Sequence, residues 1–397
     1  MNNPNAPASR RAPPKKASWS LNSRAGRGVL FQILALLAVA AAIWFLAHNT
    51  QKNMDARGIQ SGFDFLGSTA GFDIGETLID YHPSESYGKA IWVGVLNTLK
   101  VAVVGIVFAT LLGVTIGIGR FSRNALVRGL CYSYVEVFRN IPILLQLLMW
   151  YLVFIQVLPP SNEAWNLGDL FFLSKAGFAL PYPVTGVAQV LAGAALGVLL
   201  GWLWRRRAQQ RFELTGQDGD RIFAPIALVI VLAIAGWAVA GMPTEWNLPK
   251  QLIFMVDGGV AATPEFMALV LGLTVYTASF IAEVVRGGIQ SVTAGQQEAA
   301  AALGLNPRQN MKLVVLPQAM RVIIPSLTNQ YLNLTKNSSL AVVVGYPDVV
   351  SIANTSINQS GRAVECIAIV MLVYLTTSLG TSAFMNVYNK RMAIQER

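Results

Sequence analysis

The sequence predicts an all-α polytopic membrane protein with about eight transmembrane helices. Of its 397 residues, 54% are hydrophobic and only 13% are charged, which is about half the charged fraction of an average soluble domain. The mean hydropathy is +0.48, and apolar stretches of the roughly 20 residues that a helix needs to cross a bilayer recur along the chain. These observations outweigh the length, which alone would suggest two or three soluble domains.

Residues 1–28 are rich in Pro, Asn, Ala, Arg and Lys and show no apolar periodicity, so we predict a disordered basic tail. The first membrane helix follows at about Val29–Ala47, and a polar loop completes the segment 29–87. A cleaved signal peptide is the alternative, because a basic region precedes an apolar one. The end of the apolar region, Phe45-Leu46-Ala47, offers no cleavage site of the small-x-small kind, so an uncleaved helix is expected.

Seven further apolar stretches complete the set of spans, and some exceed the bilayer thickness and must tilt. They are Ile91–Gly119, Cys131–Leu158, Val184–Trp204, Ile222–Gly241, Phe266–Val285, Val322–Gly345 and Ala363–Met385. If the N-terminus is inside and the spans alternate, 21 of the 30 Lys and Arg residues lie on the inside, six lie on the outside and three lie within spans. Because positive charge accumulates on the cytoplasmic side, we predict that both termini, including the C-terminal segment 391–397, are cytoplasmic. The net charge of +10 follows these loops, which argues against nucleic-acid binding.

Several kinds of chemistry lack the residues they need. Cys131 and Cys366 lie in apolar segments, and His48 and His82 stand alone, so we predict neither a disulfide framework nor a metal site nor catalytic residues. The chain contains no G-x-x-x-x-G-K-[ST] phosphate loop. The sequence therefore indicates a protein that is not an enzyme and has no cofactor, with any nucleotide bound by a partner.

The loop of about residues 286–321 is long for a connection and has a helical pattern of its own, which Gly304, Pro307 and Pro317 interrupt. Ala299–Ala302 would form a smooth helix surface that another backbone can approach closely. Gly304 suits a left-handed turn that ends this helix, and Asn306-Pro307 suits the start of a second helix. Such a helix pair can dock on a soluble partner, and the Glu298 carboxylate can face either a basic partner residue or solvent.

The spacing of this loop resembles the signature of ABC-importer permeases, E-A-A-x3-G-x9-[apolar]-x-L-P. It is matched here by Glu298-Ala299-Ala300, Gly304, Val314 and Leu316-Pro317. The resemblance implies that Glu298, Ala299, Ala300, Gly304, Leu316 and Pro317 form the loop that couples the chain to a separate ATPase, which binds the ATP.

Three more motifs resemble the polar amino-acid permeases of the histidine/glutamine type. They are Asn97-Thr98-Leu99-Lys100, Tyr134-Val135-Glu136-Val137-Phe138-Arg139-Asn140-Ile141-Pro142 and Leu334-Thr335-Lys336-Asn337-Ser338-Ser339-Leu340. That family commonly has Lys-Asp-Thr-Ser-Leu in the last motif, so Asn337 and Ser338 depart from it where the family has Asp and Thr. The resemblance covers about residues 88–390, which would form the transmembrane domain of an importer of type I with a core of five helices.

Beyond that core, the chain has its N-terminal helix and an inserted helix pair at about 184–241. The insertion and Phe138-Arg139-Asn140-Ile141-Pro142 are similar to the Q-type permease of general L-amino-acid importers of Gram-negative bacteria, the Aap/Bzt type. An even number of inserted spans preserves the topology of the core, so we expect the pair to be peripheral.

Charged residues within spans are costly and are therefore candidates for function. We predict that Glu136 pairs with Arg139, and Glu283 with Arg286, because each pair is three residues apart on a helix. The polar cluster around Lys336 would instead line the translocation path: Asn333, Lys336, Asn337, Ser338 and Ser339. Pairing of Lys336 with Glu136, with Glu283 or with a partner permease remains the alternative.

The resemblance implies a permease subunit of an ATP-driven importer of L-amino acids in the bacterial inner membrane. Its partners would be ABC ATPase subunits, a second and non-identical permease, a periplasmic amino-acid-binding protein, the L-amino-acid substrate and the lipid bilayer. A narrower glutamate/glutamine permease is one alternative. A secondary amino-acid transporter driven by an ion gradient is another, although such folds show internal repeats and acidic residues near the midplane, which are scarce here.

Overall fold

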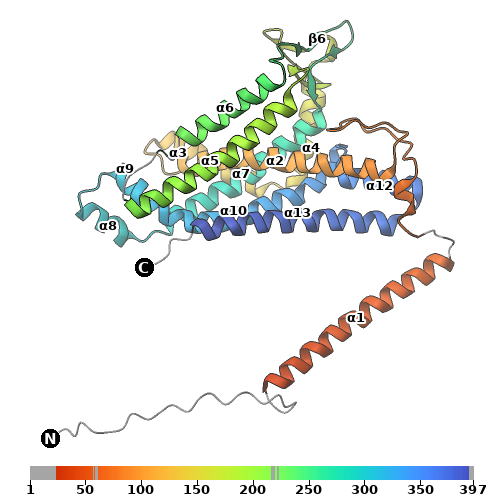
Figure 1. Cartoon of the computed structure of the whole chain (residues 1–397), viewed down its shortest axis with the longest axis horizontal. Coiled ribbons are helices and arrows are strands. Elements are labelled where there is room, and N and C mark those ends of the chain that lie inside the picture. Colours follow the sequence, from red (N-terminus) through yellow and green to blue (C-terminus); the bar gives the residue numbers. More distant parts are fainter. Residues whose placement is uncertain (1–23, 57, 59–60, 216–219, 221–222, 393–397) are drawn as a thin grey trace. The chain divides into compact units, whose positions relative to one another are not determined.

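The computed structural model describes residues 24–56, 58, 61–215, 220 and 223–392, and most of these are helical (Figure 1). The described residues form two compact units. The first contains those up to Phe63 together with Ser360–Glu365, and the second contains those of Asp64–Gln359 and from Cys366 onward. In the first unit, the backbone N–H of Gly62 donates to Glu365 Oε1 at 2.6 Å.

Helix α1 (Arg24–Ala56) is longer at both ends than the predicted span Val29–Ala47. Residues 24–28, predicted as part of the tail, are helical. The rest of the predicted tail, residues 1–23, lies outside the described residues. At the other end of the chain, α13 continues to Met392. Of the predicted C-terminal segment 391–397, only residues 393–397 lie outside the described residues.

The second unit contains the other predicted spans, except for the first three residues of α13. These are α2 (Tyr87–Gly119), α3 (Ala125–Asn140) with α4 (Ile143–Val157), α5 (Val187–Thr215), α6 (Phe223–Val239), α7 (Pro264–Gln290), α10 (Leu316–Asn337) and α13 (Ala363–Met392). Among the described residues, six helical segments are long and apolar enough to cross a membrane, or seven if the bent pair α3 and α4 is one span. Helix α6, with 17 residues, is a shorter apolar helix. Each of the eight predicted spans therefore corresponds to helical structure, and the chain is a multi-span membrane protein.

The predicted span Cys131–Leu158 is not one straight helix. It consists of α3 and α4, which meet at an angle of 105°. Ile141 is extended, with φ −93° and ψ 126°, because the ring of Pro142 disfavours helical geometry in the residue before it. Gln146 is buried, and its Nε2 donates to the carbonyls of Phe138 and Ile141 at 2.9 Å each. The bend is thus held on both sides by one side chain.

The shorter helices connect the spans. They are the 3₁₀ turns η1 (Asp64–Gly67), η2 (Ser161–Glu163) and η4 (Ser338–Leu340), the π-helical turn η3 (Met311–Val315), and the helices α8 (Ala294–Ala302), α9 (Pro307–Asn310), α11 (Ala341–Val344) and α12 (Val349–Ser360). Helix α12 was not predicted from the sequence.

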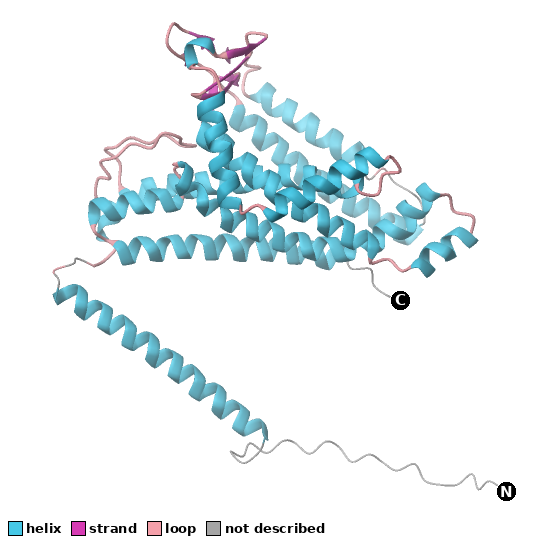
Figure 2. Cartoon of the chain, turned by 180° about the vertical axis from the view of Figure 1, so that it is seen from behind, coloured by secondary structure: helices cyan, strands magenta, loops and turns pink. Residues whose placement is uncertain are grey.

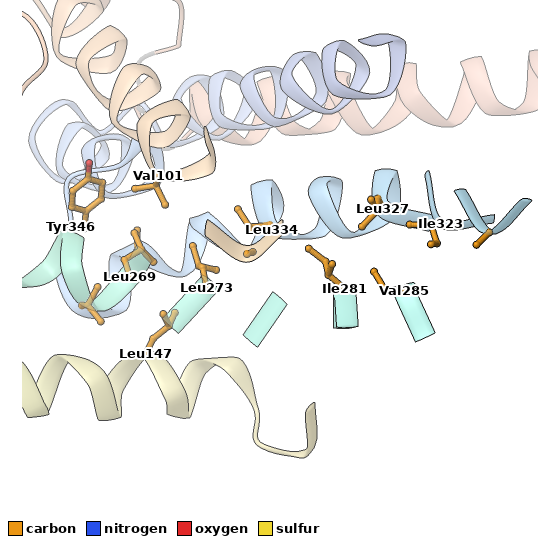
Figure 3. Close-up of a cluster of buried hydrophobic side chains, with 14 of the residues drawn as sticks. Val101, Leu147, Leu269, Leu273, Ile281, Val285, Ile323, Leu327, Leu334 and Tyr346 are labelled. Carbon is orange, nitrogen blue, oxygen red and sulfur yellow. The ribbon is translucent and has the colours of Figure 1, made fainter. Parts of the chain in front are cut away.

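The core of the second unit lies among α2, α4, α7 and α10 (Figure 3). Leu273, Ile281 and Leu334 are completely buried there. Glycines bring α2 and α7 together: a Cβ at Gly113 would lie 2.6 Å from the Cβ of Ile281, and one at Gly117 would lie 2.8 Å from that of Val285. Gly113-x-x-x-Gly117 is therefore a helix-packing motif, in which residues without a Cβ let two helices approach closely.

The inserted pair α5 and α6 packs through a seam of glycines. A Cβ at Gly193 would lie 2.1 Å from the carbonyl oxygen of Leu232, and one at Gly236 would lie 2.3 Å from that of Gln189. The two backbones are therefore in direct contact.

Short strands accompany the inserted pair and gather in one region of the second unit (Figure 2). Four of them form an antiparallel sheet in the order β1 (Trp165–Leu167), β2 (Phe171–Ser174), β3 (Gly177–Leu180) and β8 (Val260–Ala262). Two further pairs are β4 (Tyr182–Pro183) with β5 (Trp246–Asn247), and β6 (Lys250–Gln251) with β7 (Val256–Asp257). Because β8 directly precedes α7, this sheet connects the insertion to the start of a core helix. These strands were not predicted from the sequence.

Candidate functional site

The α8–α9 loop, residues 291–315, contains the motif Glu298-Ala299-Ala300. Helix α8 ends in a Schellman motif, in which the N–H groups of Gly304 and Leu305 donate to the carbonyls of Ala301 and Ala300 at 2.9 and 3.1 Å. Gly304 has φ +76°, a left-handed conformation that a residue with a Cβ adopts only at a cost. The predicted turn at Gly304 is confirmed.

Helix α9 begins as predicted at Asn306-Pro307. Asn306 Oδ1 accepts from the N–H of Gln309 at 2.9 Å, and Gln309 Oε1 accepts from the N–H of Asn306 at 3.0 Å. This is a capping box, and Pro307 occupies the first helical position, where no N–H is needed. The π-helical turn η3 then leads into α10, whose first two residues are Leu316 and Pro317.

The α8–α9 loop and the start of α10 expose several large apolar side chains. Ala300 and Val315 are buried, which anchors the loop on the end of α10. In contrast, 81% of Leu303 and 60% of Leu313 are exposed, and Met311 and Leu316 are also exposed. Glu298 and Ala299 are exposed as well, and Glu298 forms no ion pair with a described residue. The loop thus presents large apolar side chains that no other described part of the chain covers.

Glu283 of α7 is surrounded by three arginines from three helix ends. Its carboxylate accepts from Arg286 Nε at 3.0 Å, as the sequence predicted, and from Arg120 Nη1 at 2.5 Å, and Arg139 Nη1 lies 3.9 Å away. Arg120 is the C-cap of α2 and Arg139 lies in the last turn of α3. One carboxylate therefore ties α2 and α3 to α7, close to the point where α7 leads into the α8–α9 loop.

The predicted pair of Glu136 with Arg139 is wrong. Arg139 turns toward Glu283 and lies over the ring of Phe280, with 5.2 Å from its Cζ to the ring centroid. Glu136 is exposed and forms no ion pair with a described residue. Spacing along a helix shows only that two side chains can meet, and here the neighbouring helix offers Arg139 a better partner.

The motif Asn97-Thr98-Leu99-Lys100 joins α2 to two loops. Asn97 is fully buried, and its Nδ2 donates to the carbonyls of Glu76 and Pro347 at 2.8 and 2.9 Å. Thr98 Oγ1 accepts from the N–H of Val349, the first residue of α12, at 3.1 Å. Lys100 forms an ion pair with the carboxylate of Glu76, whose other oxygen accepts from Thr263 Oγ1 at 2.7 Å. The charge of Lys100 is therefore neutralised within this unit.

The predicted path residues lie where α10 ends and the chain tightens into η4. Asn333 and Lys336 are exposed, and Asn337 and Ser339 are half-buried. Ser338 is buried and donates to the carbonyl of Thr335 at 2.7 Å, so it faces the interior of the unit. Lys336 pairs neither with Glu136 nor with Glu283, which corrects these two alternatives.

Two acidic residues that were not predicted from the sequence, Glu76 and Asp348, have well-defined contacts. Glu76 lies in a loop without any recognisable pattern, so no sequence signal indicated it. Asp348 precedes α12 and caps it, accepting from the N–H of Ser351 at 2.8 Å. An Asp directly before an apolar helix is a cap signal that could have indicated both α12 and this residue.

Burial is the main cause of the shifted pKa of the Asp348 carboxyl. It raises the pKa of the carboxyl to about 7, although the bonds from Ser351, Val350 and Tyr374 oppose the shift. In the part of the chain that the structure describes, no group of three or more His, Cys, Asp and Glu side chains could hold a metal ion.

The chain is similar in sequence to known transport proteins. The family described as "Binding-protein-dependent transport system inner membrane component" matches residues 105–394. The chain is 46% identical over 373 residues to a general L-amino acid transport system permease protein, AapQ of Rhizobium johnstonii, covering 94% of this chain and 93% of that protein. It is also 46% identical over 389 residues to the Escherichia coli protein YhdX, named as an amino-acid ABC transporter permease, covering 96% and 98% of the two chains. Its identity to BztB of Rhodobacter capsulatus, named as a glutamate/glutamine/aspartate/asparagine transport system permease protein, is 38% over 406 residues, covering 94% and 95%.

Proposed function

The chain belongs to the family of binding-protein-dependent transport system inner membrane components, and from this premise we propose that it is the permease subunit of an ATP-driven importer of L-amino acids. The observation that carries the proposal is the α8–α9 loop, with its exposed apolar side chains, inside a chain of this family. The chain itself makes and breaks no covalent bonds. The family assignment decides against a transporter driven by an ion gradient.

We propose that both termini face the cytoplasm of a bacterial cell. The basic residues support this orientation: 21 of 30 Lys and Arg residues then lie on the cytoplasmic side and six lie on the outer side. The α8–α9 loop is cytoplasmic in this orientation, where an ATPase can reach it.

The loop would bind the ATPase through its exposed apolar side chains, above all Leu303 and Leu313. Apolar side chains exposed to water on a rigid helix pair are typical of a protein interface. ATP binding to the paired ATPase subunits would draw the loops together and bias the spans between two states. Because Val315 and Ala319 are buried in the core, movement of the loop is passed directly to α10.

The translocation path would run along the exposed polar face of α10. Asn329, Asn333 and Lys336 lie on this face at helical spacing and are exposed in this chain. Polar side chains within a span are costly in lipid, so a water-filled path or a second permease must cover them. Asn337 and Ser339 would border the path, whereas the buried Ser338 would shape the turn.

The substrate class follows from the named functions of the relatives. A relative of 46% identity is named for general L-amino acids and one of 38% identity for four acidic and amide amino acids. We propose the broader range, with a separate periplasmic binding protein delivering the substrate, and a glutamate/glutamine permease as the alternative. The second permease of the complex would be a different chain.

The test is to purify this chain from its native membrane in mild detergent after crosslinking and to identify its companions by mass spectrometry. We expect an ATPase with a Walker motif and a second permease. The recovered complex in proteoliposomes, given binding protein and ATP, should accumulate several classes of labelled L-amino acids. Recovery of the chain alone, or uptake that follows an ion gradient and ignores ATP, would contradict the proposal. Uptake limited to glutamate and glutamine would favour the narrower alternative.

A further inference from the structure

The end of α5 that faces away from the strands has a dense group of positive charges. Arg205, Arg206, Arg207 and Arg211 follow the apolar part of the helix and are all exposed. None of them forms an ion pair with a described residue. Asp220, the described acidic residue at the start of α6, is engaged elsewhere, since its two carboxylate oxygens accept from the N–H groups of Phe223 and Ala224 at 2.9 Å each. The four arginines, here called the α5 basic end, are therefore not neutralised by any described residue.

The length of α5 places this group at the level of lipid headgroups. Its apolar part runs from Val187 to Trp204, and these eighteen residues rise about 27 Å, close to the thickness of the hydrocarbon core of a bilayer. Arg205–Arg207 lie in the next turn, and Arg211 follows one turn later. The positive charges thus begin where the hydrocarbon ends.

Two tryptophans mark the same level. Trp202 and Trp204 are exposed, and Trp side chains are enriched at the membrane–water interface. Arg206 lies over the ring of Trp202, with 5.7 Å from its Cζ to the ring centroid, and Trp204 Nε1 donates to the carbonyl of Asp220 at 3.2 Å. These contacts fix both rings beside the charged group.

The outer surface of the inserted pair α5 and α6 is suited to contact with lipid. Leu199, Ile226, Ile230 and Val231 are exposed, while the glycine seam already occupies the inner faces of α5 and α6. A helix pair that buries its polar backbone internally and exposes branched aliphatic side chains is suited to hydrocarbon.

We propose that the α5 basic end binds the phosphate groups of anionic phospholipids in the inner leaflet. Guanidinium groups bind phosphate oxygens through paired N–H donors, and clusters of basic residues next to a membrane helix attract acidic headgroups. Only the assignment to the inner leaflet rests on the orientation in the proposed function.

The test is native mass spectrometry of the whole purified complex, counting phosphatidylglycerol molecules retained after detergent extraction. The variant Arg205→Gln/Arg206→Gln/Arg207→Gln should lose retention about fivefold for each charge removed. The matched variant with Lys at all three positions keeps the charge and the orientation, so it should retain most of the lipid. Lys175→Gln/Lys250→Gln, which removes charge among the strands, should behave as the parent.

Retention by the parent should also fall as salt is raised, because exposed charges are screened. This measurement needs no variant, and it is independent of uptake, so failure of the proposed function would not be mistaken for failure of this inference. Equal retention by the Gln and parental proteins, or retention that resists high salt, would overturn the proposal. If the Gln variant lost the ATPase but retained as many lipid molecules as the parent, the α5 basic end would be assigned to a protein partner instead.

Discussion

Arg120 and Glu283 join the end of α2 to the end of α7, with 2.5 Å between Arg120 Nη1 and Glu283 Oε2. Only 10% of the Arg120 side chain and 27% of the Glu283 side chain is exposed. Arg286 and Arg139 complete the group, so a single carboxylate faces three guanidinium groups. This arrangement makes Glu283 the residue on which the packing of three helix ends depends.

Replacement of Glu283 by Gln should destabilise the protein by about 2 kcal/mol, because partly buried arginines lose a charged acceptor. We expect a lower thermal unfolding midpoint in detergent and reduced uptake. Glu136→Gln is the matched control, since Glu136 is exposed and has no ion-pair partner among the described residues. Equal midpoints for the two variants would show that the arginines do not depend on Glu283.

Replacement of Gly304 by Pro should abolish uptake while the chain still inserts into the membrane. Proline cannot adopt φ +76° and lacks the N–H that donates to Ala301, so the Schellman motif cannot form. Gly295→Ala in α8 is the control, because a Cβ there has nothing within 4 Å and alanine favours a helix. Normal uptake by Gly304→Pro at normal expression would remove the argument that this loop geometry serves coupling.

Replacement of Glu298 by Lys should weaken recovery of the ATPase and reduce uptake, because the exposed carboxylate would lose its attraction for a basic partner residue. Glu298→Gln tests the charge without adding a repulsion and should have a smaller effect. The measurement is the ratio of ATPase to permease after crosslinking. An unchanged ratio in both variants would indicate that Glu298 faces solvent.

Asp348 should make the protein more stable as the pH falls from about 7 toward 5. The ordinary pKa of the carboxyl is 3.8 and burial raises it to about 7 in the folded protein. Between these values the folded state holds a proton that the unfolded state has released, so stability declines as the pH rises, by up to about 1.4 kcal/mol per pH unit. Asp348→Asn keeps the helix cap and should remove this slope from the unfolding midpoint. A parental slope of the opposite sign, or one unchanged in Asp348→Asn, would contradict the assignment.

Replacement of Gly113 by Val should separate α2 from α7. Its side chain would collide with Ile281 and with the carbonyl of Ala278, to which a Cβ would come within 2.8 Å. Overpacking of this kind typically costs about 1–3 kcal/mol, measured as a lower unfolding midpoint. Gly287→Ala in α7 meets open space and should have little effect. Similar midpoints for both variants would show that the helices can move apart freely.

The local features of this protein were open to prediction because neighbouring residues determine them. Apolar stretches indicated the helices, Gly304 indicated a left-handed turn, and Asn306-Pro307 indicated a helix start. The break between α3 and α4 is also local, since Pro142 causes it, but continuous hydropathy across Cys131–Leu158 concealed the bend. Hydropathy indicates that a segment prefers the membrane, but it does not show whether the helix axis bends within that segment.

The sequence by itself thus determined the class of the protein, the approximate spans and the position of the α8–α9 loop. Only the tertiary structure decided which charges meet. Glu283 binds Arg120 from a helix 163 residues earlier in the chain, and Lys100 binds Glu76 from a loop without a recognisable pattern. A charged side chain in a membrane protein needs an oppositely charged partner or water. The sequence offers several possible partners and does not show which of them is used. Packing selects among them, because it fixes which side chains of α2, α3 and α7 reach the same point.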